Sequence, residues 1–87
     1  MIKYSLRKFL IMAVKAYIFI VTKPGTSIEV AKEVSKIKGV YSADPIYGRF
    51  DVIATVEVES PEALSRLVYE VIEKVPNILR TETSIVL

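Results

Sequence analysis

The sequence contains no cysteine, no histidine and no glutamine. Without cysteine, the chain can form neither a disulfide nor a thiolate metal site. Histidine is the commonest metal ligand and the commonest general base near neutral pH, so its absence removes the usual tools of catalysis. Carboxylates and lysines remain, but we predict that the protein is not an enzyme and holds no metal or cofactor. The same absences are a feature of thermophile proteins.

No apolar run approaches the roughly 20 residues that span a bilayer. Residues 1–13 carry three basic residues and no acid, and lead into the apolar segment Phe9 to Val14, which resembles the start of a secretory signal. Lys15 interrupts this run, and the residues after it are needed for a strand. We therefore predict a cytoplasmic protein without a membrane span. Residues 1–13 are expected to form an N-terminal arm or helix, unless translation starts at Met12.

An excess of charge of one sign is also missing. The net charge of +2 comes from the first 13 residues, because from Val14 onward nine Lys and Arg stand beside ten Asp and Glu. A nearly neutral body argues against a broad phosphate-binding surface. We therefore predict no direct contact with nucleic acid.

Apolar residues, in contrast, are abundant. They make up 52% of the 87 residues, and the mean hydropathy is +0.40. A chain of this length forms one domain, which we place at residues 14–87. Small domains bury little of their surface and are often stabilised by association. We therefore expect the apolar surplus to form a subunit interface.

The hydrophobic pattern predicts the element order β-α-β-β-α-β. Strands are indicated by runs of β-branched residues or by alternation of apolar and polar residues. The second strand should lie at an edge of the sheet, because Pro45 cannot donate to a sheet ladder. The expected strands are residues 14–22, 40–47, 50–59 and 78–86.

Two amphipathic helices separate these strands. The first is expected to begin with a capping box at Thr26 and to end before Gly39. The second is expected to begin at Ser60 and to stop at Pro76. The two halves echo each other, since Gly39 before the second strand matches Asn77 before the fourth.

With right-handed crossovers, this order predicts an α+β fold of ferredoxin-like topology. Its four-stranded antiparallel sheet has the order 4-1-3-2, with both helices on one face. Both sides of the central strand one are apolar, so one set of side chains faces away from the helices. Leaving that set in water would forgo roughly 1.5–3 kcal/mol per large side chain. We predict a dimer through the sheet, or partial cover by the N-terminal arm, with the interface at Tyr17, Phe19 and Val21.

The segment Tyr47-Gly48-Arg49-Phe50-Asp51 is a candidate ligand loop. Gly48 allows a positive φ, and free N–H groups beside it can hold a carboxylate. Arg49 could also pair with a carboxylate and Asp51 with an ammonium group, which suits a zwitterion such as an amino acid. The alternative is a plain hairpin turn, with Asp51 accepting backbone N–H bonds and Phe50 in the core. Taken alone, the residues favour the turn.

Several stretches form a recognisable pattern together. They are Lys15-Ala16-Tyr17, Gly39-Val40-Tyr41-Ser42-Ala43, Gly48-Arg49-Phe50-Asp51-Val52-Ile53-Ala54, the pair Leu64 and Leu67, and Arg80-Thr81-Glu82-Thr83-Ser84-Ile85-Val86-Leu87. This pattern resembles the ligand-binding domain of the leucine-responsive regulatory protein/AsnC family, also called the RAM domain. The resemblance covers everything but the N-terminal arm.

The resemblance implies a domain that dimerises through its sheet, often forms rings of dimers, and binds a free amino acid between dimers. Carried to this sequence, it makes Tyr47 to Asp51 the ligand loop and adds Thr81 and Thr83 as candidates. Full-length members carry an N-terminal helix-turn-helix that reads DNA, which thirteen residues cannot build. We therefore predict a stand-alone amino-acid sensor that changes its assembly or joins a DNA-binding relative as a regulatory subunit.

Two other classes share this element order. An RNA-recognition domain needs aromatic residues where Arg49 and Asp51 stand. Small dimeric monooxygenases and isomerases place a His, Tyr or Asp between sheet and helices, and here Tyr17, Tyr41, Tyr47 and Asp51 are available. Tyrosines at strand spacing usually serve packing. A cavity lined by Tyr and Asp inside one subunit would favour the enzyme, and a pocket between subunits at Gly48 would favour the sensor.

Overall fold

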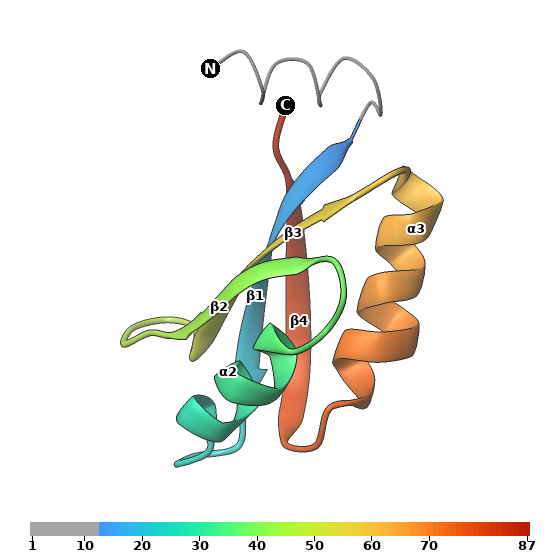
Figure 1. Ribbon diagram of the computed structural model, residues 1–87. Coiled ribbons are helices and arrows are strands. Elements are labelled where there is room, and N and C mark those ends of the chain that lie inside the picture. Colours follow the sequence, from blue (N-terminus) through green and yellow to red (C-terminus); the bar gives the residue numbers. More distant parts are fainter. Residues whose placement is uncertain (1–12) are drawn as a thin grey trace.

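The computed structural model describes residues 13–87, in which four strands form one antiparallel sheet (Figure 1). The strand order β2-β3-β1-β4 is the expected order 4-1-3-2 read from the opposite edge. Both helices lie on one face of the sheet, so the ferredoxin-like α+β fold is confirmed. The strands are β1 (Val14–Thr22), β2 (Val40–Pro45), β3 (Val52–Val58) and β4 (Ile78–Ile85).

The N-terminal arm or helix expected at residues 1–13, together with the alternative start at Met12, falls almost wholly outside the described residues. That part of the sequence analysis stays a prediction. Within residues 13–87, no helix has both the length and the apolar character that crossing a membrane requires.

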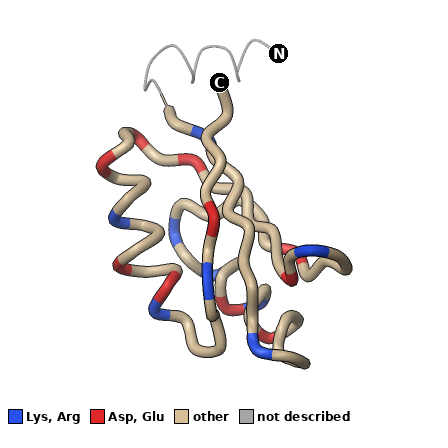
Figure 2. Tube along the Cα trace, turned by 180° about the vertical axis from the view of Figure 1, so that it is seen from behind, with Lys and Arg blue, Asp and Glu red and all other residues tan. Residues whose placement is uncertain are grey.

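Side chains along β1 alternate between the two faces of the sheet. Every second residue from Ala16 to Ile20 points toward the helices and is fully buried. The matching positions on β3, from Val52 to Val56, are buried in the same way. The other face, here called the open face, carries Tyr17, Phe19 and Val21, which are only half-buried. Figure 2 shows the sheet from behind, where few charged residues lie along β1.

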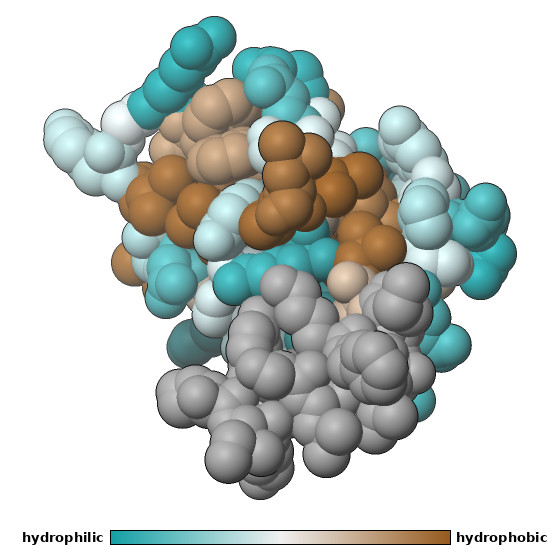
Figure 3. Space-filling model, turned by 90° about the horizontal axis from the view of Figure 1, so that it is seen from above, coloured by the Kyte–Doolittle hydropathy of each residue, from teal (hydrophilic) through white to brown (hydrophobic). Residues whose placement is uncertain are grey.

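Large apolar side chains also remain exposed elsewhere. In the view from above, apolar side chains lie in the open between hydrophilic ones (Figure 3). The chain ends there with Val86 and Leu87, whose exposed fractions are 42% and 117%. This exposed apolar surface agrees with the expectation that the domain associates.

The first helix, α2 (Ser27–Ser35), differs from its expected form at both ends. The predicted capping box at Thr26 was wrong. The hydroxyl of Thr26 donates to the carbonyl of Lys23 at 2.7 Å and accepts from no backbone N–H of the helix. The helix also ends four residues before Gly39. A short turn therefore connects it to β2.

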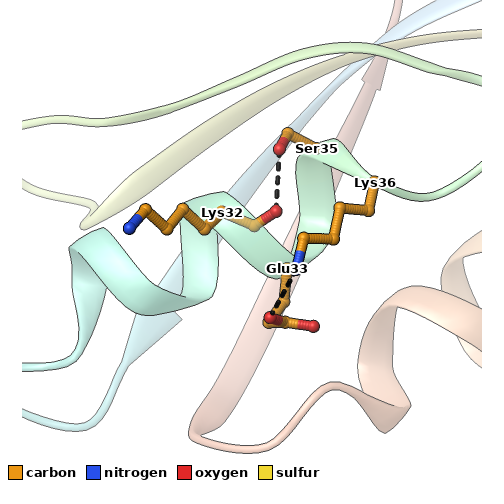
Figure 4. A network of polar contacts seen from close by, with 4 residues as sticks. All are labelled: Lys32, Glu33, Ser35 and Lys36. Carbon is orange, nitrogen blue, oxygen red and sulfur yellow. Dashed lines mark hydrogen bonds and ion pairs between the residues drawn. The ribbon is translucent and has the colours of Figure 1, made fainter.

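The solvent side of α2 is held by local contacts (Figure 4). The hydroxyl of Ser35 donates to the carbonyl of Lys32 at 2.7 Å, which satisfies one of the free carbonyls of the last turn. Lys36 and Glu33 form an exposed ion pair at 3.2 Å. Such a pair stabilises a helix by only about 0.3–0.5 kcal/mol, so this face is ordinary solvated surface.

The second helix runs as expected from Ser60 to Pro76, but its geometry changes along its length. It begins as α3 (Pro61–Arg66), where the hydroxyl of Ser60 accepts from the N–H of Ala63 at 3.1 Å. It continues as one π-helical turn, η1 (Leu67–Val71), and a 3₁₀ turn, η2 (Ile72–Lys74). Leu64, Leu67, Val68 and Ile72 pack this helix onto the sheet.

The echo between the two halves extends to the backbone. Gly39 before β2 has φ of +96°, and Asn77 before β4 has φ of +77°. The carbonyl of Gly39 accepts from the N–H of Glu57 at 3.0 Å, and the carbonyl of Asn77 accepts from the N–H of Lys23 at 2.9 Å. Each half therefore uses one left-handed residue to bring the chain from its helix into the next strand.

Asn77 offers a direct test of this backbone requirement. A side chain in the left-handed region costs roughly 1–2 kcal/mol, and asparagine tolerates it better than alanine. We expect Asn77→Ala to lower the free energy of unfolding by about 1 kcal/mol and Asn77→Gly to leave it within about 0.5 kcal/mol. Urea denaturation measures both. Equal losses in the two variants would show that the side chain, and not the backbone angle, matters at this position.

Candidate functional site

The candidate loop connects two strands that are shorter than expected. Strand β2 ends at Pro45 and β3 begins at Val52, whereas the sequence pattern placed these boundaries at Tyr47 and Phe50. Pro45 lies at the end of an edge strand, as expected. The N–H of Ile46 donates to the carbonyl of Asp51 at 2.9 Å and closes the loop.

The tip of this loop is open to solvent. Tyr47 has an exposed fraction of 107%, and Gly48 and Arg49 are also exposed. The φ angle of Gly48 is +159°, and a Cβ atom added there would meet no other atom within 4 Å. Backbone groups at the tip can therefore be approached by a ligand or by another subunit.

Asp51 anchors the loop to the central strand. Its carboxylate oxygen Oδ2 accepts from the N–H of Thr22 at 2.9 Å, and its own N–H donates to the carbonyl of Ile20 at 2.9 Å. The first of these bonds is the kind expected of a plain turn. Among the described residues, the second carboxylate oxygen makes no hydrogen bond. One carboxylate oxygen of Asp51 therefore holds the loop in place, and the other is available to a ligand.

Phe50 lies on the open face and not in the core under the helices. It is half-buried, and its ring centroid is 5.2 Å from that of Phe19. The guanidinium groups of Arg49 and Arg80 lie 5.8 Å and 6.0 Å from the Phe50 ring centroid. The turn alternative was therefore wrong about Phe50, whose ring connects the candidate loop to the predicted dimer interface.

Arg80 was not among the candidate residues. It lies on β4 opposite Val21, and its Nη1 is 2.6 Å from Oε2 of Glu82 in an exposed ion pair. Sequence spacing could not have indicated its proximity to Phe50, because that depends on how β3, β1 and β4 are aligned. The register of the sheet brings the two together.

Thr81 and Thr83 point to the other side of the sheet. They lie opposite Ile20 and Ile18, whose side chains are buried under the helices. The hydroxyl of Thr81 donates to Oε2 of Glu73 at 2.6 Å. Thr83 lines a groove of about 260 Å³ beside α3. Within one chain, these threonines do not join the candidate loop, which lies at the β2 edge and contacts the open face.

Comparison with known proteins places this chain in a family. Residues 15–87 match the model of the Lrp/AsnC ligand binding domain. The chain is a member of that family. The match covers both helices and all but the first residue of β1, so the fold and the suspected resemblance are confirmed together.

Solved structures agree with this Lrp/AsnC assignment. FFRP-DM1 is 34% identical with a TM-score of 0.79, and the match covers 85% of this chain and 99% of that one. AsnC of E. coli is 26% identical with a TM-score of 0.84, covering 92% of this chain and 54% of that one. A feast or famine regulatory protein of M. tuberculosis, complexed with L-methionine, is 25% identical with a TM-score of 0.72, covering 85% and 50%. No curated protein matches the sequence.

Two of the grooves formed by the described residues 13–87 bear on the enzyme alternative. The groove beside α3 contains Tyr69 but no aspartate. A larger groove of about 420 Å³, between the turn at Gly39 and η1, contains neither tyrosine nor aspartate. Neither is the cavity of Tyr and Asp that would favour a monooxygenase or isomerase. Within residues 13–87, no three acidic side chains converge into a metal site.

Proposed function

We propose that this Lrp/AsnC domain binds a free amino acid at the loop Tyr47 to Asp51 and couples that binding to its assembly. The observation that carries the proposal is the way Asp51 is held: one oxygen is tied to Thr22, which leaves the second for a ligand. A bound amino acid would place its ammonium group at that second oxygen. Its carboxylate would lie near Arg49 and the backbone N–H groups beside Gly48.

The family supports an amino acid as the effector. The mycobacterial relative is complexed with L-methionine, and its match covers 85% of this chain. A zwitterion also fits the opposite charges of Arg49 and Asp51, which lie two residues apart in the loop. The regulator names of the relatives favour a sensor or an accessory subunit of a DNA-binding relative over an enzyme.

Thr81 and Thr83 would take part only through a second subunit. They face the helices, while the loop of the same chain contacts the open face through Phe50. A ligand that touches both groups must therefore lie between subunits. Binding and assembly would then share free energy, since each would favour the other.

A thermal-shift screen of the twenty amino acids tests this function. Saturating binding at a hundredfold excess over Kd stabilises a protein by about 2.7 kcal/mol, so at least one amino acid should raise the melting temperature measurably. The mass of the assembly should be measured with and without each amino acid. If no amino acid shifts the melting temperature, the sensor function is wrong, whatever the assembly does.

A further inference from the structure

The larger groove, about 420 Å³ in volume, lies where the turn at Gly39 faces the second helix (Figure 1). We call it the Gly39 groove. The turn packs directly against the helix, since a Cβ atom added at Gly39 would lie 3.6 Å from Cδ2 of Leu67. Pockets that hold a bound partner have volumes of about 300–1,000 Å³, so this groove is large enough for several side chains.

One wall of the Gly39 groove is a row of apolar side chains. Ala63, Leu67 and Val71 line it at intervals of four residues along the second helix. Side chains with this spacing form a ridge on one face of a helix. Val71 ends the π-helical turn and is 42% exposed. Within residues 13–87, this part of the apolar row is left uncovered.

The sequence of residues 1–12, which lie outside the described part of the chain, has a matching pattern. Ile2, Leu6 and Leu10 recur at the same interval of four residues. Apolar anchors with this spacing are typical of segments that bind in a groove as an amphipathic helix. Three anchors of the segment therefore correspond to three positions on the wall.

The segment also joins the sheet beside this groove. Val14, the first residue of β1, pairs with Val58 of β3, and Val58 lines the groove. The second helix begins only three residues after Val58, at Pro61. Twelve helical residues extend over about 18 Å, whereas the row from Ala63 to Val71 extends over about 12 Å. The segment is long enough to follow the whole row from the end where it leaves the sheet.

The charges at the groove favour a basic segment. Three carboxylates line it, on Glu57, Glu59 and Glu70, against the two cations of Lys38 and Arg66. Among the described residues, Glu59 and Glu70 make no hydrogen bond or ion pair. Residues 1–12 carry three basic side chains and no acid. The groove beside α3, in contrast, is lined by no carboxylate.

We infer that residues 1–12 dock in the Gly39 groove of their own chain, with Leu10 at Ala63 and Ile2 at Val71. The segment then runs antiparallel to the second helix, because it enters the groove at the end where that helix begins. This position leaves the open face to a second subunit, so the arm does not provide the partial cover considered for that face. The contact does not involve the candidate loop and is independent of amino-acid binding.

Disulfide trapping in the full chain tests the position and direction of the segment. The protein has no cysteine, so any disulfide joins the two introduced residues. Their Cα atoms must come within about 4.4–6.8 Å. Ile2→Cys/Val71→Cys and Leu10→Cys/Ala63→Cys should form a disulfide within one chain at least about tenfold faster than the exchanged pairs, Ile2→Cys/Ala63→Cys and Leu10→Cys/Val71→Cys. Mass spectrometry and non-reducing gels measure the products.

The reactivity of a single cysteine provides a second measurement. A docked segment covers position 71, so the thiol of Val71→Cys should react with a maleimide at least about tenfold more slowly than that of Val71→Cys/Leu6→Asp, in which the segment is released. Ile28→Cys is the matched control. Ile28 is 67% exposed on α2 and does not line the groove, so Leu6→Asp should leave its rate unchanged.

Several outcomes would overturn the inference. They are disulfides that join two chains, expected pairs that form no faster than the exchanged ones, and a pair on the open face, Leu6→Cys/Phe19→Cys, that forms as fast as the expected pairs. Equal maleimide rates with and without Leu6→Asp would overturn it independently. Far-UV circular dichroism establishes that each variant is folded. A chain that traps its segment as expected but responds to no amino acid would disprove the proposed function alone.

Discussion

Replacing Phe19 with glutamate is expected to break the assembled protein into monomers. Phe19 lies on the central strand, on the open face, and is half-buried with its ring 5.2 Å from that of Phe50. If a second subunit covers this face, the new carboxylate would be buried without a partner. Removing an unpaired charge from water costs several kcal/mol even after relaxation.

Symmetry makes the penalty larger. A dimer through the sheet is formed by the same surface on both subunits, so each interface would receive two glutamates. Glu82 already lies opposite position 19 on β4, so each subunit's face would carry two carboxylates and the interface four. A loss of about 4 kcal/mol or more corresponds to at least a thousandfold weaker association. At micromolar concentration, sedimentation velocity should then show monomers.

The matched control is Ile28→Glu, which introduces the same charge on the solvent side of α2. Its mass should equal that of the unchanged protein. Circular dichroism distinguishes dissociation from unfolding, because a folded monomer keeps its helix signal. The prediction fails if folded Phe19→Glu protein retains its mass, or if the unchanged protein is already a monomer.

The spacing of apolar residues was sufficient to predict the fold, because buried side chains recur at short and regular intervals along both strands and helices. Alternation along β1 and the helical spacing of Leu64 and Val68 identify buried faces without knowledge of the partner. The crossover rule then leaves few topologies, and the edge position of Pro45 agrees with the one observed. Local pattern and global fold point to the same answer, which is typical of foldable sequences.

The predictions that failed concern hydrogen bonds and boundaries. Thr26 had the spacing of a capping residue, but its hydroxyl found the carbonyl of Lys23 in the preceding turn. Threonine hydroxyls bond readily to nearby backbone, so spacing alone does not decide which group they choose. The strands on either side of the loop end early because the loop closes through the bond from Ile46 to Asp51.

Only part of the candidate site could be predicted from the sequence, for a related reason. The loop itself is contiguous and could be identified, but its surroundings come from other strands. Arg80 approaches Phe50 through the register of β4 on β1, and a shift of one residue would move it to the other face. Thr81 and Thr83 were grouped with the loop by resemblance, whereas their pairing partners place them on the helix side of the sheet.

Variants of Asp51 can separate loop anchoring from the proposed ligand binding, because one oxygen accepts from Thr22 and only the other is assigned to a ligand in the proposed function. Thr22 is only 5% exposed, so Asp51→Ala would leave its buried N–H without an acceptor. That loss should lower the free energy of unfolding by about 1–3 kcal/mol. Asp51→Asn keeps an oxygen for Thr22 and removes only the negative charge. We expect it to change stability by less than about 1 kcal/mol.

The same pair of variants then tests whether Asp51 holds the ammonium group of an amino acid. Charge-assisted hydrogen bonds are roughly twice as strong as neutral ones, so Asp51→Asn should weaken binding strongly. For a hundredfold weaker Kd, the stabilisation at a fixed amino-acid concentration falls from about 2.7 to about 0.4 kcal/mol. Thermal shift measures this directly in a protein whose loop is still anchored. If Asp51→Asn responds like the unchanged protein, the role of Asp51 is to anchor the loop, and the ammonium group binds elsewhere.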